Sequence, residues 1–292
     1  MFKLCRFISP EGVLRPSDHV CAGLLADDFT VLDLTVAGWP LLNMLLERHD
    51  RLELLAGLAG QDLPRWPLSQ LTVLPPLDSQ EVWAAGVTYL RSKKARMDES
   101  AFSASAYDRV YDAARPELFF KALAYKVAGP GEKVGIRRDA KWSVPEPELA
   151  LVFNSRGELA GFTIGNDMSA RDLEGENLLY LPQAKIYRGS CAVGPFIAVG
   201  ATEAEARQWT IGVHIQRGEQ TVFAGETMVG RLKRTFADLQ QFLFRCQEFP
   251  YGVTLLTGTG VVPPDDFTLQ AGDLVKITVT GVGTLENPVI VV

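Results

Sequence analysis

The sequence has few histidines and no clustered cysteines, and this scarcity argues against several kinds of catalytic site. Its three histidines, His19, His49 and His214, lie far apart and outside any motif. A serine or cysteine nucleophile activated by histidine is therefore not expected. The four cysteines are scattered without a Cys-Xaa-Xaa-Cys pair, so neither a zinc site nor a disulfide framework is indicated. We expect the cysteines to be reduced packing residues.

Excess basic charge and long apolar runs are also missing. The formal net charge is −6 at pH 7, which argues against a nucleic-acid partner because phosphate binding requires a basic face. There is no run of about eighteen apolar residues that would suggest a membrane span. The first residues lack the apolar region of a signal peptide. The sequence therefore predicts a globular cytoplasmic protein that binds neither nucleic acid nor membranes.

Two domains are predicted, divided by the double proline Pro75-Pro76. Residues 1–77 combine short β-prone pieces with one helix, expected over 40–48, in a small α/β domain. Residues 78–292 form the larger domain, in which short β-prone runs alternate with glycine turns. Beyond residue 117, helices are expected only over 203–208 and 236–247. The predicted fold class is α+β and mainly β.

A polar stretch over residues 93–114 follows a strand expected over 81–90. It is rich in charged, serine and tyrosine residues. Such a stretch can cover a site as a mobile lid or be a simple surface insertion. The sequence leaves both interpretations open.

Two glutamates in an extended segment are the most informative feature of the chain. Glu146 and Glu148 are two positions apart, so in a strand they share one face. Pro147 lies between them, and proline inside a strand favours an edge or a bulge. For a lone Glu-Xaa-Glu, solvated surface acids are the usual interpretation.

A third carboxylate is expected to join them from the next strand. The segment 154–157 predicts a turn, and the returning strand leads to Asp167. With the turn centred near Ser155, Glu146 lies opposite Gly165 and Asp167 lies opposite Val144. All three carboxylates then share one face, and a slip of one residue would reverse that face.

Three converging carboxylates would repel one another unless they were neutralised. Unit charges about 4 Å apart repel by about 4 kcal/mol per pair at an effective dielectric constant of about 20, and a divalent cation removes this cost. Oxygen ligands suit Mg²⁺, Mn²⁺ or Ca²⁺ better than Zn²⁺. An octahedral ion with three protein ligands keeps about three positions for water and substrate.

Several segments together resemble the fumarylacetoacetate hydrolase family over residues 82–292. The matching segments, in family order, are Gly86-Val87-Thr88-Tyr89, Pro116-Glu117-Leu118-Phe119-Phe120-Lys121, Glu146-Pro147-Glu148-Leu149-Ala150, Asn166-Asp167-Met168-Ser169-Ala170-Arg171-Asp172, Ala184-Lys185, Gly194-Pro195 and Gly258-Thr259-Gly260. The resemblance implies a mixed β-roll behind a small N-terminal α/β domain. It also implies Mg²⁺ or Mn²⁺ held by Glu146, Glu148 and Asp167, and assembly as a homodimer or homotetramer.

One departure from the family pattern bears on the reaction. Hydrolases of the family carry a water-activating histidine a few residues after the motif tyrosine, and here Ser92 stands at that position after Tyr89. The segments 88–92, 144–148 and 181–185 resemble those of dehydratases within the family. This resemblance implies a metal-dependent dehydratase that converts a 2-keto-3-deoxypentonate to 2,5-dioxopentanoate. An acylpyruvate hydrolase, or a 2-oxo acid decarboxylase or isomerase, remains the alternative.

Three catalytic residues are expected from their motif positions. Glu117 is the candidate base, or the residue that orients a metal-bound water, although an exposed acid at a strand start is equally expected. Lys185 is the candidate acid or electrostatic stabiliser. Lys121 is expected to neutralise the enolate or the neighbouring carboxylates.

Three further residues are candidates for substrate binding. Arg91 and Ser92 are expected to bind the sugar-acid carboxylate and hydroxyls, or else Ser92 only caps a helix. Thr259, flanked by glycines, is expected to hold the substrate carboxylate, or to belong to an ordinary tight turn. Arg171 and Asp172 are expected to form a structural pair and are not included among the catalytic residues.

Overall fold

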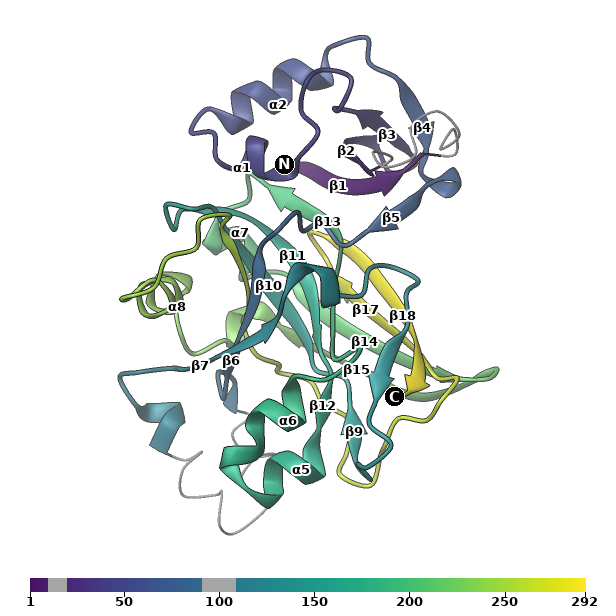
Figure 1. Ribbon diagram of the computed structural model, residues 1–292, viewed down its shortest axis with the longest axis vertical. Helices are drawn as coiled ribbons and strands as arrows, with labels where there is room; N and C mark the ends of the chain where they lie inside the picture. Colours follow the sequence, from purple (N-terminus) through teal and green to yellow (C-terminus); the bar gives the residue numbers. More distant parts are fainter. Residues whose placement is uncertain (10–19, 91–108) are drawn as a thin grey trace.

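The computed structural model describes residues 1–9, 20–90 and 109–292, and an 11-stranded sheet forms its largest element (Figure 1). The order along this sheet is β4-β3-β2-β1-β13-β11-β10-β16-β6-β7, and β5 pairs with β1. The strands are β1 (Phe2–Ile8), β2 (Val20–Asp27), β3 (Thr30–Asp33), β4 (Arg65–Pro67), β5 (Thr72–Leu74), β6 (Glu81–Gly86), β7 (Glu117–Ala122), β10 (Pro147–Phe153), β11 (Leu159–Asp167), β13 (Cys191–Val199) and β16 (Val253–Leu256).

Two smaller sheets complete the β structure of the described residues. One has the order β15-β14-β17-β18-β8 and the other pairs β12 with β9. Their strands are β8 (Val134–Ile136), β9 (Ser143–Val144), β12 (Ser169–Ala170), β14 (Thr210–Arg217), β15 (Gln220–Met228), β17 (Leu274–Val279) and β18 (Gly283–Val291). Strand β14 alternates between buried and partly buried positions, whereas all of β10 and nearly all of β11 are buried. Strands buried on both faces exclude water, so they suit a dry site.

The helices are short and lie outside the sheets (Figure 1). They are α1 (Leu42–Leu46), α2 (Arg51–Ala59), α5 (Arg171–Glu176), α6 (Leu181–Lys185), α7 (Glu203–Ala206) and α8 (Phe236–Leu243), with 3-10 turns η1 (Leu68–Gln70), η2 (Ala124–Lys126), η3 (Leu178–Tyr180) and η4 (Val229–Arg231). Within the described ranges, no helix has the length and apolar character needed to cross a membrane. Strands dominate, and the predicted α+β class is confirmed.

Sequence patterns located only some of these helices. Helices α1, α7 and α8 fall inside expected ranges, and α7 and α8 begin with capping boxes at Thr202 and Thr235. The expectation of one helix in residues 1–77 was wrong, because α2 forms as well. The prediction that helix beyond residue 117 would be confined to two segments was wrong, because α5 and α6 also form. Both are short, α5 contains Gly175, and Pro182 stands in the first turn of α6. Such segments give little helical periodicity to detect.

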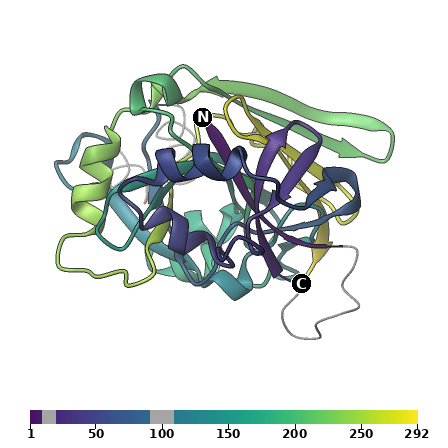
Figure 2. The same ribbon diagram turned by 90° about the horizontal axis from the view of Figure 1, so that it is seen from above.

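The N-terminal strands continue the large sheet rather than forming a separate one. Strand β1 pairs antiparallel with β13, with Leu4 opposite Ile197. Helices α1 and α2 cover one face of this part and bury leucines against Leu4 and Ile197 (Figures 1 and 2). The division near residue 77 stays a prediction.

The cysteines are free, and not all of them pack. Cys5 and Cys191 are buried, as expected for packing residues, and Cys21 is partly buried. Cys246 is exposed, so the expectation of a packing role was wrong for this residue.

Candidate metal centre

The β10–β11 hairpin brings the three predicted carboxylates together, in a register two residues away from the expected one. Glu148 pairs with Gly165, and the Asp167 N–H donates to the Glu146 carbonyl at 3.0 Å. A shift of two residues keeps every side chain on its predicted face. The predicted turn forms, since the Gly157 N–H donates to the Asn154 carbonyl at 3.0 Å.

Pro147 does not mark an edge strand, so that expectation was wrong. Strand β10 lies between β11 and β16. Pro147 is its first residue, and β16 pairs only with Ala150–Phe153. The missing N–H of proline therefore removes no ladder hydrogen bond on that side.

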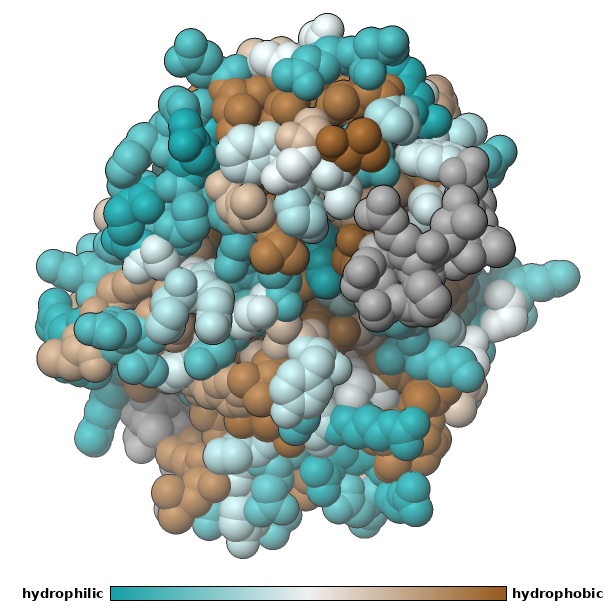
Figure 3. Space-filling model, turned by 45° about the horizontal axis from the view of Figure 1, so that its top comes forward, coloured by the Kyte–Doolittle hydropathy of each residue, from teal (hydrophilic) through white to brown (hydrophobic). Residues whose placement is uncertain are grey.

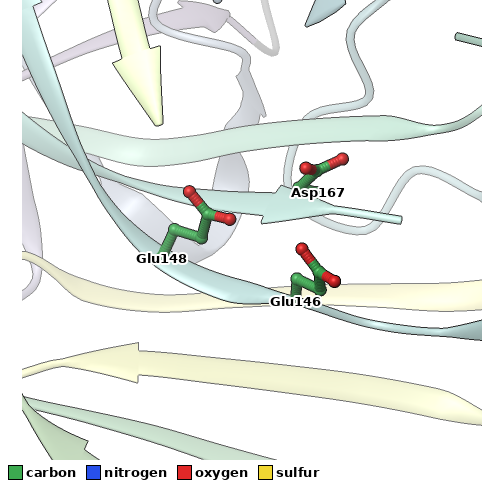
Figure 4. Close-up of side chains that lie close together, drawn as sticks. All are labelled: Glu146, Glu148 and Asp167. Atoms are coloured by element: carbon green, nitrogen blue, oxygen red, sulfur yellow. The ribbon is translucent and has the colours of Figure 1, made fainter. Parts of the chain in front are cut away.

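The three carboxylates are buried and face one another (Figure 4). Glu146, Glu148 and Asp167 are 4%, 1% and 1% exposed. One oxygen from each lies within 4.8 Å of the others. A buried set of three oxygen ligands around one point fits a hard divalent cation such as Mg²⁺.

Two lysines bind these carboxylates. Lys185 donates to Glu146 Oε2 and to Asp167 Oδ2, both at 2.9 Å, and to the Ser169 hydroxyl at 2.5 Å. Lys121 pairs with Asp167 Oδ1 and donates to two backbone carbonyls, those of Met168 and Lys185. Both lysines are at most 1% exposed, so their charges are offset by these acceptors rather than by water.

An arginine and a backbone amide also contact the carboxylates. Arg171 Nη2 donates to Glu146 Oε1 at 2.7 Å, and the Gly258 N–H donates to Glu148 Oε2 at 2.5 Å. The expected pair between Arg171 and Asp172 was wrong, because Asp172 Oδ2 accepts from the Lys141 N–H at 2.7 Å.

The carboxylates disfavour one another's ionisation. Burial raises the pKa of Glu148 well above its usual range, and the charges of Asp167 and Glu146 raise it further. A divalent ion at the shared point would favour the ionised form of all three acids.

A narrow cavity opens beside the cluster, and several expected site residues line it. Glu117, Phe119, Lys185 and Thr259 line it together with two of the carboxylates, and Lys121 lies behind Asp167. The Thr259 hydroxyl donates to the Val261 carbonyl at 2.9 Å.

Glu117 lies at the boundary between this cavity and a second one. The second cavity, of about 340 Å³, is lined mostly by apolar side chains and also contains Glu117. The Glu117 carboxylate lies against Gly86, where any Cβ atom would collide with it. The expected substrate-binding residues Arg91 and Ser92, and residues 93–108 of the expected lid, lie outside the described residues.

The comparison with known families decides the family. The model described as "Fumarylacetoacetate (FAA) hydrolase C-terminal" matches residues 81–290. The chain belongs to this family. The match extends from β6 to β18 and includes all three carboxylates.

Individual relatives match over most of their length. The chain is 43% identical, over 214 residues and 73% of each chain, to a probable 2-keto-3-deoxyxylonate dehydratase of Haloferax volcanii. It is 39% identical, over 78% of this chain and 77% of the relative, to the 2-dehydro-3-deoxy-D-arabinonate dehydratase of Saccharolobus solfataricus. A solved structure of 2-keto-3-deoxy-D-arabinonate dehydratase complexed with magnesium and 2,5-dioxopentanoate superposes with a TM-score of 0.82, at 32% identity over 99% of each chain.

Sequence reasoning missed two donors to the three carboxylates. Gly258 was expected only to allow close backbone approach beside Thr259, yet its N–H holds Glu148. Arg171 was assigned to the wrong partner. The available signal was its place four residues after Asp167, where the chain leaves the hairpin that carries the ligands.

Proposed function

We propose that this protein is a Mg²⁺-dependent hydro-lyase that converts a 2-keto-3-deoxypentonate to 2,5-dioxopentanoate. The observation that carries the proposal is the buried trio Glu146, Glu148 and Asp167. It lies in a chain that matches a dehydratase structure over 99% of its length. That structure contains magnesium and 2,5-dioxopentanoate. Mn²⁺ fits the same oxygen ligands.

The reaction removes one water molecule and rearranges hydrogen. A proton leaves C3 and a hydroxide leaves C4, which forms a C3–C4 double bond. Hydrogen then moves from C5 and its hydroxyl to C3 and C4, and C5 becomes an aldehyde. A bound Mg²⁺ would polarise the 2-oxo group and so make the C3 proton more acidic. The reaction requires no redox cofactor.

Lys185 is the proposed acid or electrostatic stabiliser. Its ammonium lies at the cavity wall, 2.9 Å from two ligand carboxylates and 5.8 Å from the centre of the Phe119 ring. From this position it can stabilise negative charge that develops on the substrate. Its contact with Ser169 fixes the direction of the side chain.

Glu117 is the proposed base. It lines both cavities, so its carboxylate lies where the substrate would pass from one to the other. Replacement by glutamine retains the size but removes the proton acceptor. We expect kcat to fall by roughly 10²–10⁴-fold with a smaller change in KM.

The geometry favours different roles for Lys121 and Thr259 from those first expected. Lys121 has three N–H groups and three acceptors, so we propose that it holds Asp167 in place rather than contacting the substrate. The Thr259 hydroxyl donates to Val261. Its backbone N–H is therefore our candidate donor to the substrate carboxylate.

Product formation tests the function directly. The protein is incubated with Mg²⁺ and each C4 epimer of the substrate, and the aldehyde proton is followed by NMR. We expect aldehyde from one or both epimers and none from the sample treated with EDTA. Release of pyruvate from acylpyruvates, without aldehyde from the sugar acids, would contradict the proposal and favour a hydrolase.

We also propose a cytoplasmic homodimer or homotetramer, which the family resemblance supports. Large apolar side chains are exposed, among them Leu179 at 83% and Tyr125 at 79%. Figure 3 shows hydrophobic areas among hydrophilic ones on one face. Light scattering gives the oligomeric state, and cell fractionation gives the compartment.

A further inference from the structure

Each ligand carboxylate has one oxygen held from outside the cluster. Arg171 holds Glu146 Oε1 at 2.7 Å, and Lys121 holds Asp167 Oδ1. The Gly258 N–H holds Glu148 Oε2 at 2.5 Å. The three donors come from three different parts of the fold.

Two of the remaining oxygens share one donor, and one oxygen from each of the three acids lies within 4.8 Å of the others. Glu146 Oε2 and Asp167 Oδ2 both lie 2.9 Å from Lys185 Nζ, so these two oxygens face the same point. An ionised carboxylate offers about four lone-pair sites on its two oxygens. Each oxygen can therefore accept from Lys185 and still bind an ion.

This arrangement favours one kind of metal coordination. To bind an ion through both oxygens, a carboxylate must turn both of them toward it. A donor that holds the other oxygen of Glu146 or Asp167 opposes that rotation. Mg²⁺ takes six ligands at about 2.0–2.1 Å in near-ideal octahedral geometry, whereas Ca²⁺ takes about 6–8 ligands at 2.3–2.6 Å and often binds both oxygens of a carboxylate.

We propose that Arg171 is a positioning residue that makes the site selective for Mg²⁺ over Ca²⁺. It holds Glu146 so that a single oxygen of this carboxylate reaches the ion. The inference depends on the metal site of the proposed function and not on the substrate.

The position of Glu146 explains why Arg171 decides its orientation. Glu146 precedes β10 by one residue, and the Asp167 N–H joins its carbonyl to β11. By contrast, Glu148 lies inside the strand and its carboxylate is held by a backbone donor. Side-chain contacts therefore have more influence on the orientation of the Glu146 carboxylate than on that of Glu148.

Arg171 is itself fixed against the segment that carries Glu146. It is 2% exposed, and its N–H donates to the Trp142 carbonyl at 2.8 Å. Strands β12 and β9 pair Ser169 with Val144. This two-stranded sheet joins the start of α5 to the residues just before Glu146. Arg171 can therefore orient the Glu146 carboxylate without a large motion of either segment.

Calorimetric titration with Mg²⁺ and Ca²⁺, in the absence of substrate, tests the proposal. We expect the wild-type protein to bind Mg²⁺ more tightly. In Arg171→Leu, the ratio of the Ca²⁺ to the Mg²⁺ dissociation constant should fall by roughly tenfold. Arg171→Lys should recover part of that ratio because it keeps a charged donor.

Arg217→Leu is the matched control. Arg217 binds the buried Asp273 through two contacts of 2.8 Å in the smaller sheet. This variant loses a comparable ion pair and should keep the wild-type ratio. An equal change in both affinities for Arg171→Leu would indicate general damage to the site and would overturn the proposal.

A second variant keeps the test decisive if Arg171→Leu does not fold. Arg171→Gln keeps a polar side chain that is too short to hold Glu146 Oε1 and should lower the ratio in the same direction, and an unchanged ratio in this folded variant would overturn the proposal. Failure of the proposed function is separable. A wild-type protein that selects Mg²⁺ but forms no aldehyde would refute the dehydratase and leave this inference standing.

Discussion

At one end of the β10–β11 hairpin three carboxylates are buried together, whereas at the other end Glu158 binds residues of its own turn. Burial raises the pKa of Glu148. Hydrogen bonds from Arg156 and Asn154 lower the pKa of Glu158 to about 2. Arg156 and Asn154 lie within four residues of Glu158, which His49 also approaches at 3.5 Å, whereas the partners of the buried cluster come from β7, α5 and α6. A short turn can therefore stabilise one acid, whereas the buried cluster requires the whole fold.

The largest expected effect is a loss of activity when a carboxylate is replaced at the buried end of the hairpin but not at its turn. Glu148→Gln should lower kcat/KM by roughly a thousandfold or more and abolish Mg²⁺ binding, because it removes a ligand charge. Glu158→Gln makes the same chemical change at the turn and should keep both properties. Steady-state kinetics and calorimetry measure them. Near-normal turnover by Glu148→Gln would place the reaction elsewhere.

A pair of glycine variants tests how closely the backbone approaches the buried end. Gly258 has φ +91°, and a Cβ there would collide with the Thr88 hydroxyl. Gly272 has φ +89° and open space around it. We expect Gly272→Ala to lower the free energy of unfolding by about 1–2 kcal/mol.

Gly258→Ala should cost about 1–3 kcal/mol more than Gly272→Ala, because overpacking adds to the strained backbone. It should also weaken Mg²⁺ binding by displacing the N–H that holds Glu148. Urea unfolding gives the free energies. Equal losses of unfolding free energy in the two variants would show that the close approach of Gly258 to Thr88 adds no cost to the substitution.

The smallest expected effect concerns the turn. Arg156→Gln should raise the pKa of Glu158 toward its ordinary value, which an NMR titration of the carboxyl measures. Because the folded pKa is depressed, the pair stabilises the protein above the unfolded value of about 4.3. This stabilisation is lost as the pH falls toward about 2.

The energy involved in this turn should be small. Arg156 and Glu158 are both 38% exposed, so solvent screens their interaction. The Arg156–Glu158 pair should contribute less than about 1 kcal/mol to the free energy of unfolding at pH 7, and Arg156→Gln also removes the contacts of Arg156 with Glu47. The difference in unfolding free energy between variant and wild type should become smaller as the pH falls. A difference that grows would contradict the lowered pKa of Glu158.

The sequence predicted the carboxylate cluster better than its surroundings. Faces of strands repeat every two residues, so a register error of two residues still placed Asp167 beside Glu146 and Glu148. The partners of a carboxylate follow no such period. Arg171 is expected from the sequence to form a structural pair with Asp172, and only the fold shows that it reaches Glu146.

Local sequence patterns also could not predict whether β10 is an edge strand or an internal strand. Pro147 suggested an edge, yet β10 is internal and the proline stands before β16 begins to pair. Whether a strand is internal depends on segments far along the chain, such as Val253–Leu256. The contacts of Lys121 and Lys185 depend on long-range packing in the same way.

Anomalous diffraction from a crystal soaked with Mn²⁺ tests the central claim most directly. We predict one strong peak bound by a single oxygen from each of Glu146, Glu148 and Asp167, at about the short metal–oxygen distances of an octahedral ion. A peak elsewhere, or an ion that contacts fewer than three of these side chains, would contradict the account.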